Sequence, residues 1–568
     1  AAVQKRFVQL MADNKEEAQF SKMLATIRRD APVDFVLPQK TWKEGAESKV
    51  VLEMLNEFYF RSLIPRVKQV LGNVGETAGQ NSLAPLAPPD GAVPDGENRG
   101  LFGHAVSPES FEQAALAVWV LDTNVTEPSL EDILRVGKSD DFDKAFAHIK
   151  KQIHEKELDF VYEKIELPLT PVRRRREKHG VKIDKAFLGK LSKEYTKELQ
   201  KIAARIYKAA GGEFNIASPK QLGEVLFDRL GLAAKKKTAG GARSTRESEL
   251  QKLSGQHPII EDILSYRELA KLLSTYIDTI PLLLDNGDRL HTTYIQAGTT
   301  TGRVASQNPN LQNIPIKTEL GRAIRHAFVA DQGMTLVAFD YSQVELRIAA
   351  LLSGDEVLTE IFRNGRDVHA EVASRVFHVK PDEVTYEMRR RAKVINFGIL
   401  YGMGVTSLQQ SLSTSRAEAQ EFYNQYFAAF PKLSAYMDDT IAQASKLGYT
   451  QTLFGRRRYF DGLRSPIPYV KAAAERMALN APFQGTAADL FKLAMLAVDN
   501  YLQKDGRGYL LLQVHDELVF EIKSGAVGEV ASKLRTLMEE IIPEKERKGI
   551  PITVEGKAGK NWGDMKKI

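Results

Sequence analysis

The sequence predicts an α+β fold in which strands from distant parts of the chain form a small sheet that carries long helical insertions. Short apolar runs, typical of buried strands, lie at 290–297, 334–339 and 508–522. Long stretches with helical periodicity occupy 184–280 and 355–505. The chain of 568 residues shows no internal repeat, and its length corresponds to roughly three or four domains.

The composition narrows the class of protein. Hydrophobic residues make up 43% and charged residues 27%, as is ordinary for a soluble globular protein. No apolar run reaches the roughly 18 residues of a membrane helix, and the first residues lack a signal-peptide pattern, so we expect a cytoplasmic protein. There is no cysteine, so any metal must be bound by oxygen or histidine, and oxygen ligands suit Mg²⁺ or Mn²⁺. A heat-adapted intracellular source and deliberate removal of cysteine both explain that absence.

The net charge of +6 is a weak indication of a polyanionic partner. Local clusters of cations carry more information. They are Arg173 to Arg176, Lys235 to Lys237, Arg389 to Arg391 and Arg456 to Arg458. Taken singly, each cluster is explained equally well by a solvated surface and by contact with a polyanion.

The first 248 residues are predicted to contain helices, a linker and a flexible basic element. Helical periodicity at 1–65 is followed at 72–104 by a stretch rich in Gly, Pro, Asn and Ala, which predicts a linker. A compact helical segment is expected at 107–165. A long helix follows at about 186–210, ended by glycines. The Lys-, Gly-, Ser- and Thr-rich stretch 235–248 predicts a flexible basic element that contacts phosphates.

The segment 334–354 combines a buried strand with a carboxylate. Met334 to Phe339 predict the strand, which Asp340 ends. Ser342 and Glu345 have the spacing of a capping box that opens an amphipathic helix. Asp340 either helps to cap that helix or binds a metal, and this segment alone leaves both interpretations open.

The segment 508–522 has two apolar runs around His515, Asp516 and Glu517, which predicts a β-hairpin with an acidic turn. Adjacent carboxylates repel each other unless water or a cation neutralises them. For this tripeptide alone, a solvated turn is the simpler interpretation.

Between these segments, Arg389, Lys393 and Phe397 are spaced at i, i+4 and i+8, so they share one face of a predicted helix. Two cations and an aromatic ring on one face suit binding of a triphosphate and stacking on a base. A basic surface helix explains the charges but leaves Phe397 and Tyr401 unexplained.

Together the three segments resemble the polymerase motifs of the family A DNA polymerases, in the same order: DYSQVELR (340–347), RRRAKVINFGILYG (389–402) and VHDELV (514–519). Four further segments are similar to the family: YRELAKLLSTYID (266–278), TTTGRVASQNPNLQNIP (299–315), NAPFQGTAADL (480–490) and GKNWGDM (559–565). The similarity runs from about residue 160 to the end and corresponds to the large, Klenow-type fragment of a bacterial DNA polymerase I.

This resemblance implies a right-hand polymerase fold and a nucleotidyltransferase that copies DNA in replication and repair. The implied partners are a primer–template duplex and dNTPs, with no membrane. We expect a monomer that is bacterial in type and nucleoid-associated. The implied domains are a reduced exonuclease-like region (1–160), a thumb with its base (161–285), a palm in two parts (286–352 and 485–568) and fingers (353–484).

The resemblance also assigns the catalytic residues. Asp340, Asp516 and the backbone carbonyl of Tyr341 are expected to hold two Mg²⁺ ions, for which Mn²⁺ can substitute. Glu517 is expected to support them. Lys393 is expected to donate a proton to the leaving group.

The expected nucleotide site lies on the fingers helix. Arg389, Lys393 and His369 are expected to bind the triphosphate, and Phe397 to pack on the sugar and base. A Phe at this position, in place of Tyr, goes with discrimination against dideoxynucleotides in the family. Tyr401 is expected to stack in the insertion site until the template base displaces it.

Sugar selection and DNA contacts complete the set. Glu345, with Gln343 nearby, is expected to block a 2′-hydroxyl while also closing the capping box. The DNA contacts are expected to check pairing shape at the minor groove, whose acceptors are largely common to all base pairs. The residues concerned are Arg303, Asn313, Asn480, Gln484 and His515.

The chain departs from the family between 36 and 160, where no Asp-x-Glu strand motif of a proofreading exonuclease is found. The apolar run that ends at Asp122 is interpreted as the segment before the helix at 129–134. We therefore expect a scaffold without 3′→5′ exonuclease activity. Residues 21–35 resemble the junction that follows a 5′-nuclease domain, which suggests a truncated chain.

Two other classes of protein compete with this interpretation. A phage-type single-subunit RNA polymerase shares the two palm aspartates, but Glu345 argues against it. A duplex-binding architectural protein explains the basic clusters, but it does not require both Asp340 and Asp516. The sequence leaves open whether reverse transcription on RNA templates is a side activity.

Overall fold

The computed structural model describes residues 106–233, 243–315 and 318–568. The predictions for 1–65, 72–104 and Lys235 to Lys237 lie outside these residues. Within the described ranges, no helix is both long and apolar enough to span a membrane.

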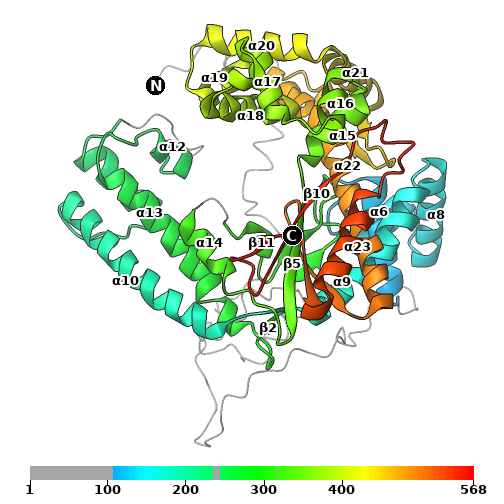
Figure 1. Ribbon diagram of the computed structural model, residues 1–568, viewed down its shortest axis with the longest axis horizontal. Helices are drawn as coiled ribbons and strands as arrows, with labels where there is room; N and C mark the ends of the chain where they lie inside the picture. Colours follow the sequence, from blue (N-terminus) through cyan, green and yellow to red (C-terminus); the bar gives the residue numbers. More distant parts are fainter. Residues whose placement is uncertain (1–105, 234–242, 316–317) are drawn as a thin grey trace, which may run out of the picture. The chain divides into compact units, whose positions relative to one another are not determined.

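The central element is a five-stranded sheet, as predicted, built from strands far apart in the chain. Figure 1 shows β5 (green) beside β10 and β11 (red). All neighbouring strands are antiparallel. Their order is β11 (Lys566–Lys567), β10 (Val554–Gly559), β5 (Met334–Tyr341), β9 (Glu517–Lys523) and β8 (Gly508–Val514).

Strands β5, β8 and β9 are buried on both faces, which explains their continuous apolar runs, whereas β10 and β11 carry exposed polar residues. Alternate residues of β5 point to opposite faces. Val337 and Phe339 join one core with helices α22 (Pro468–Asp505) and α23 (Val527–Glu539). Leu336 and Ala338 join another with α10 (Lys185–Ala210) and α13 (Ile259–Leu272). The sheet is therefore fixed from both sides.

A helical insertion leaves the sheet region through β1 (Val181–Lys182) and returns through β2 (Arg289–Leu290), which pair with each other. The long helix predicted at 186–210 is confirmed as α10 (Lys185–Ala210), which is capped by Asp184 and ends at Gly211 in a left-handed conformation. The other helical elements of the insertion are α11 (Pro219–Gly223), η3 (Glu224–Arg229), α12 (Glu247–Gln251), α13 (Ile259–Leu272), η4 (Leu273–Ile277) and η5 (Ile280–Leu282).

The expected strand at 290–297 is only partly correct. The segment divides between β2 and β3 (Thr293–Ile295), and β3 pairs with β4 (Ala305–Gln307) outside the central sheet. Three further short elements complete this part of the chain: η6 (Leu311–Asn313), α14 (Glu319–Arg325) and η9 (Ser524–Ala526).

The predicted helical region 355–505 is mostly confirmed. It is interrupted by an unpredicted hairpin, β6 (Tyr449–Gln451) and β7 (Arg457–Tyr459), followed by η8 (Asp461–Arg464). The remaining elements from 344 onward are α15 (Val344–Ser353), α16 (Glu356–Arg363), α17 (Val368–Phe377), η7 (Pro381–Glu383), α18 (Tyr386–Leu400), α19 (Val405–Leu412), α20 (Arg416–Ala429) and α21 (Pro431–Leu447).

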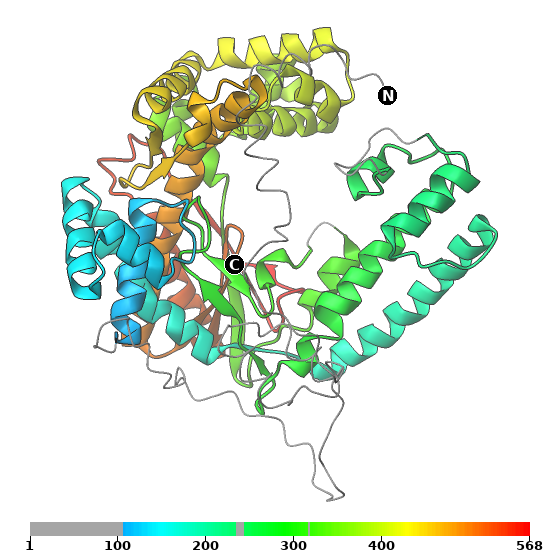
Figure 2. The same ribbon diagram turned by 180° about the vertical axis from the view of Figure 1, so that it is seen from behind.

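The compact helical segment expected at 107–165 is confirmed and has its own apolar core. It contains α6 (Pro108–Leu121), α7 (Leu130–Gly137), α8 (Phe142–Glu155) and η2 (Phe160–Glu166), which continues into α9 (Leu167–His179). In Figure 2 the blue and cyan helices lie beside the orange helix α22, which η2 and α9 contact. The apolar run before Asp122 is helix α6, with Asp122 at its C-terminal cap.

In each of two basic clusters, one arginine is buried and contacts other side chains of the protein. Arg456 is buried and pairs with Glu166 and with Asp489. Arg176 is also buried, and its guanidinium lies over the Tyr294 ring at 3.9 Å. For these two side chains, a solvated surface is the wrong interpretation.

Candidate active site

One end of the central sheet brings the two predicted aspartates together. The β8–β9 hairpin turns through His515 and Asp516, as predicted, and His515 has a left-handed φ of 53°. The amide of Tyr341 donates to the backbone carbonyl of Asp516 at 3.1 Å. Asp340 lies within β5, one residue before the end of the strand, so the strand is slightly longer than expected.

This end of the sheet collects negative charge. Asp340 is paired in register with Glu517 on one side and Glu555 on the other. Burial, and then the charges of Glu517 and Asp516, raise the pKa of Asp340 to about 7. A bound cation would relieve this repulsion.

The donors at this position are oxygen atoms, which fit Mg²⁺ or Mn²⁺ rather than a soft metal. Among the residues that the structure describes, no three Asp, Glu or His side chains converge as a ready-made metal site. Asp340, Asp516 and the Tyr341 carbonyl could therefore supply only some of the ligands of each ion. Water and substrate oxygens would supply the others.

Glu517 is held by side chains that sequence reasoning missed. Trp562 donates its indole N–H to Glu517 at 3.2 Å, and Arg325 pairs with it at 3.5 Å. The Arg325 guanidinium also stacks over the Trp562 ring at 3.8 Å. The only signal in the sequence was the similarity of the GKNWGDM segment to the family.

Glu345 does not close a capping box, so that prediction is wrong. Helix α15 begins at Val344 after Gln343, which has a left-handed φ of 53°, and no side chain caps it. The Glu345 carboxylate is 4% exposed and accepts hydrogen bonds from Arg303 at 2.8 Å and from the Tyr401 hydroxyl at 2.6 Å. Burial raises the pKa of Glu345, and these two bonds oppose the rise. Its partners lie in the site instead of in its own helix.

The predicted cationic and aromatic face is confirmed as part of a helix, α18, which Thr385 caps. Arg389 forms an ion pair with Asp367 at 2.7 Å, a partner that sequence reasoning missed. Lys393 is exposed. Phe397 lies between the rings of His369 and Tyr401, with centroid distances of 5.7 and 6.1 Å.

His369 is a neutral ring in this arrangement. Burial is the main reason that its pKa falls to about 4, and the nearby cations Arg389 and Lys393 lower it further, against the effect of Asp367. The Asn396 amide group lies 2.9 Å from the Nδ1 atom of His369. This buried contact fixes the ring beside Phe397.

The predicted DNA-contacting residues surround this centre on several elements. Asn480 and Gln484 are partly buried on α22, and His515 is exposed in the hairpin turn. Asn313 is exposed in η6. Arg303 contacts Glu345 at the centre. The roles of all five residues in DNA binding stay predictions.

Residues 185–564 match the model of DNA polymerase family A. The chain belongs to this family. The resemblance inferred from the sequence motifs and the expected fold class are thereby confirmed.

Curated members of family A are similar over much of the chain. The thermostable DNA polymerase I of Thermus aquaticus is 43% identical over 483 residues, which cover 84% of this chain and 54% of the relative. The DNA polymerase I of Pseudomonas aeruginosa is 46% identical over 403 residues, covering 70% and 44%. The chain therefore spans about half the length of the curated relatives it matches.

A solved structure of the family is also similar. It is the POL domain of Pol1 from M. smegmatis in complex with DNA primer-template and dNTP. The TM-score is 0.75 and the sequence identity 38%, and the match covers 79% of this chain and 81% of that chain.

Proposed function

We propose that this chain is a DNA-templated DNA polymerase that extends a primer 3′-hydroxyl with dNTPs and releases pyrophosphate. The observation that carries the proposal is the contact between the two halves of the site. Glu345, near the acidic end of the sheet, accepts a hydrogen bond from Tyr401 at the end of the cationic helix α18. The proposed metal-binding end of the sheet is therefore connected, through Glu345 and Tyr401, to the C-terminal end of the helix that carries Arg389 and Lys393.

We assign the catalytic part of the site to Asp340, Asp516 and the Tyr341 carbonyl. Two divalent ions, most simply Mg²⁺, would supply Lewis-acid stabilisation of the attacking and leaving oxygens when bound there. The primer 3′-hydroxyl would lose its proton to solvent as its oxygen bonds to the α-phosphorus. The bond from the α-phosphorus to the bridging oxygen breaks, and Lys393 would donate a proton to the leaving pyrophosphate. Glu517, on the neighbouring strand, would support the bound ions.

The nucleotide would lie along α18. Arg389, Lys393 and the neutral His369 would donate hydrogen bonds to the triphosphate, for which Arg389 must exchange Asp367 for phosphate oxygens. Phe397 would pack on the sugar and base. Glu345 would meet a 2′-hydroxyl, with Gln343 beside it at the start of α15.

We propose the domains that the resemblance implies: thumb with its base 161–285, palm 286–352 and 485–568, and fingers 353–484. In the thumb, a cavity of about 1180 Å³ is lined in part by Lys220, Arg243, Arg246 and Lys271. These cations suit duplex phosphates, so binding should weaken with salt.

We further propose that the enzyme lacks proofreading and works as a monomer at the bacterial nucleoid. Residues 106–160, the described part of the 1–160 region, form helices and turns and contain no strand that could carry an Asp-x-Glu motif. The region would then act as a scaffold for the polymerase.

Primer extension tests the proposal. A 5′-labelled primer–template is incubated with Mg²⁺, with dNTPs, with rNTPs or without nucleotides. The expected result is full-length product with dNTPs only and an intact primer without nucleotides. A primer that shortens without dNTPs would contradict the lack of proofreading, and efficient extension with rNTPs would favour an RNA polymerase. Binding without any extension would leave only a duplex-binding protein.

A further inference from the structure

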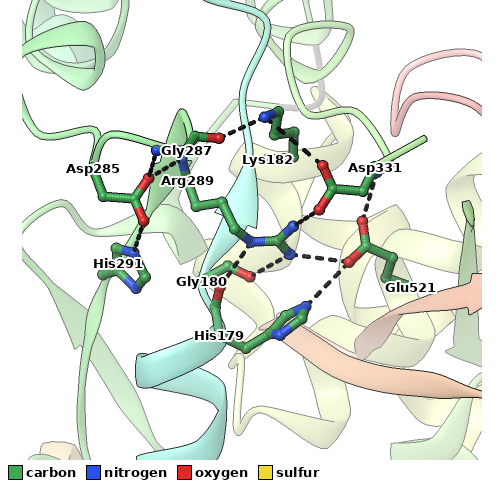
Figure 3. Close-up of polar contacts among 9 residues, drawn as sticks. All are labelled: His179, Gly180, Lys182, Asp285, Gly287, Arg289, His291, Asp331 and Glu521. Atoms are coloured by element: carbon green, nitrogen blue, oxygen red, sulfur yellow. Dashed lines mark hydrogen bonds and ion pairs between the residues drawn. The ribbon is translucent and has the colours of Figure 1, made fainter. Parts of the chain in front are cut away.

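A polar node with a buried centre lies at the root of the insertion that leaves through β1 and returns through β2 (Figure 3). Its centre is Glu521, which is 1% exposed. The Glu521 carboxylate accepts hydrogen bonds from Arg289 at 3.0 Å and from the Asp331 amide at 2.8 Å, and the His179 ring pairs with it at 3.1 Å. We call these four residues, with Gly180, the Arg289 node.

Arg289 connects every part of the node. Its Nε donates to the His179 carbonyl at 2.8 Å, and its Nη1 donates to the Asp331 carboxylate at 2.5 Å. Its Nη2 donates to the Gly180 carbonyl at 3.2 Å as well as to Glu521. A planar guanidinium can reach four acceptors in different directions, whereas a lysine ammonium offers three donors from one point.

The acceptors belong to separate segments. His179 and Gly180 lie where α9 ends and β1 begins, and Arg289 lies on the returning strand opposite Lys182. Lys182 itself donates to the Gly287 carbonyl at 2.5 Å and lies 3.8 Å from Asp331. Both crossings between the insertion and the rest of the chain are therefore held in one polar network.

The other side of the node is the central sheet. Glu521 is four positions along β9 from Glu517, which corresponds to about 13 Å of extended strand. Asp331 precedes β5, the strand that carries Asp340. The node is thus anchored to the strands of the proposed catalytic carboxylates but lies away from the reacting atoms.

Glu521 is ionised in this setting. Burial alone would raise its pKa, but the bonds from His179, the Asp331 amide and Arg289 keep the pKa below its ordinary value. Loss of Arg289 would leave a buried carboxylate with weaker compensation, which is costly. The network would be expected to loosen between the crossing and the sheet, because the crossing supplies two of the four acceptors of Arg289 and the sheet side supplies the other two.

We propose that Arg289 is a positioning residue that fixes the two root strands of the thumb to the palm sheet and thereby sets how long the enzyme holds its primer–template duplex. The proposal rests on the proposed function, since that places the helical insertion 185–282 within the proposed thumb and its base, 161–285. It predicts a change in DNA residence without a change in the chemical step.

The test compares Arg289→Lys and Glu521→Gln with the wild type and with the control Arg205→Lys. Arg205 pairs with Asp262 at 2.6 Å between two helices of the same insertion, so it does not join the insertion to the sheet. Dissociation from a fluorescent primer–template is measured with a DNA trap. Single-nucleotide incorporation is measured at saturating DNA and dNTP, and thermal melting checks folding.

We expect Arg289→Lys to dissociate from DNA about tenfold faster, with Glu521→Gln intermediate, because the buried charges lose their full set of partners. The incorporation rate at saturation should stay within about twofold of wild type, and Arg205→Lys should match wild type in both assays. If Arg289→Lys does not fold, Glu521→Gln alone carries the comparison, because it keeps the size of the side chain.

Wild-type dissociation rates in the node variants would overturn the proposal. So would an equal acceleration in Arg205→Lys, or a slower incorporation step with unchanged dissociation. Failure of the proposed function is separate: it appears as absence of incorporation in the wild type, whereas duplex dissociation is measured without any nucleotide.

Discussion

Replacing Arg456 by Met should lower the free energy of unfolding by about 3 to 5 kcal/mol. Arg456 belongs to a buried cluster of two cations and two carboxylates, Glu166, Asp489 and Lys492 being the others, and each is at most 2% exposed. Its Nε donates to Asp489 at 2.7 Å, and its Nη2 pairs with Glu166. Met has a similar length but leaves two buried carboxylates facing one cation.

The cluster joins three parts of the structure, so the effect should be cooperative. Glu166 ends η2, Arg456 precedes β7, and Asp489 and Lys492 lie on α22. Lys492 donates to Glu166 at 2.7 Å and would have to compensate it alone. The double variant Arg456→Met/Glu166→Gln restores the balance of charge, so it should cost about 1 to 3 kcal/mol less than the sum of the single variants.

The changes in the free energy of unfolding are measured by denaturant unfolding with Trp119 fluorescence as the probe. Trp119 reports on the cluster because Arg456 and Lys492 lie 5.0 and 4.8 Å from its ring centroid. Trp42 and Trp562, the other two tryptophans, are replaced by Phe in the background. The control is Arg135→Met, from a surface pair with Asp132, which should cost less than about 0.5 kcal/mol. A loss below about 1 kcal/mol for Arg456→Met, or strictly additive variants, would refute the reasoning.

Three further predictions concern the site. Glu345→Ala should raise ribonucleotide incorporation relative to dNTPs by about tenfold or more, measured as a ratio of kcat/KM, and unchanged discrimination would refute the steric role. Phe397→Tyr should reduce discrimination against dideoxynucleotides by about tenfold or more in a chain-termination assay, whereas equal selectivity would count against the assignment. His369 has a folded pKa of about 4, below its ordinary value of 6.5, so its contribution to stability is present above pH 6.5 and is lost as the pH falls towards 4. Between pH 7 and 5 the wild type should therefore lose about 2 kcal/mol more than His369→Gln in denaturant unfolding, and parallel losses would show that the ring is not buried neutral.

Local pattern was enough to predict much of the sheet and the helices. The strands β5, β8 and β9 are apolar runs, and the turn at His515 and Asp516 interrupts them in the sequence as it does in the fold. Helix α10 has both an Asp184 cap and a Gly211 stop. These signals are local, so they can be recognised without knowledge of tertiary contacts.

Features that depend on distant partners were missed. Ser342 and Glu345 have capping-box spacing, but Arg303 and Tyr401 bind the Glu345 carboxylate instead. The β6–β7 hairpin has few apolar residues, and nothing local marks Arg456 as buried beside Glu166. Local pattern singled out several candidate site residues, but their assignment to one site came from the resemblance to the family, because their nearness in space has no signature in any one segment.

The most direct test of the proposed mechanism is single-nucleotide incorporation by Asp340→Asn and Asp516→Asn, compared with Asp439→Asn, an exposed carboxylate on α21. Each reaction contains saturating duplex and dNTP over a Mg²⁺ titration, and duplex binding is measured in parallel. We expect both site variants to bind duplex but to lose at least about a thousandfold in incorporation rate, while the control matches wild type. Incorporation near the wild-type rate by either Asp340→Asn or Asp516→Asn would contradict the assignment of these two aspartates as the catalytic pair.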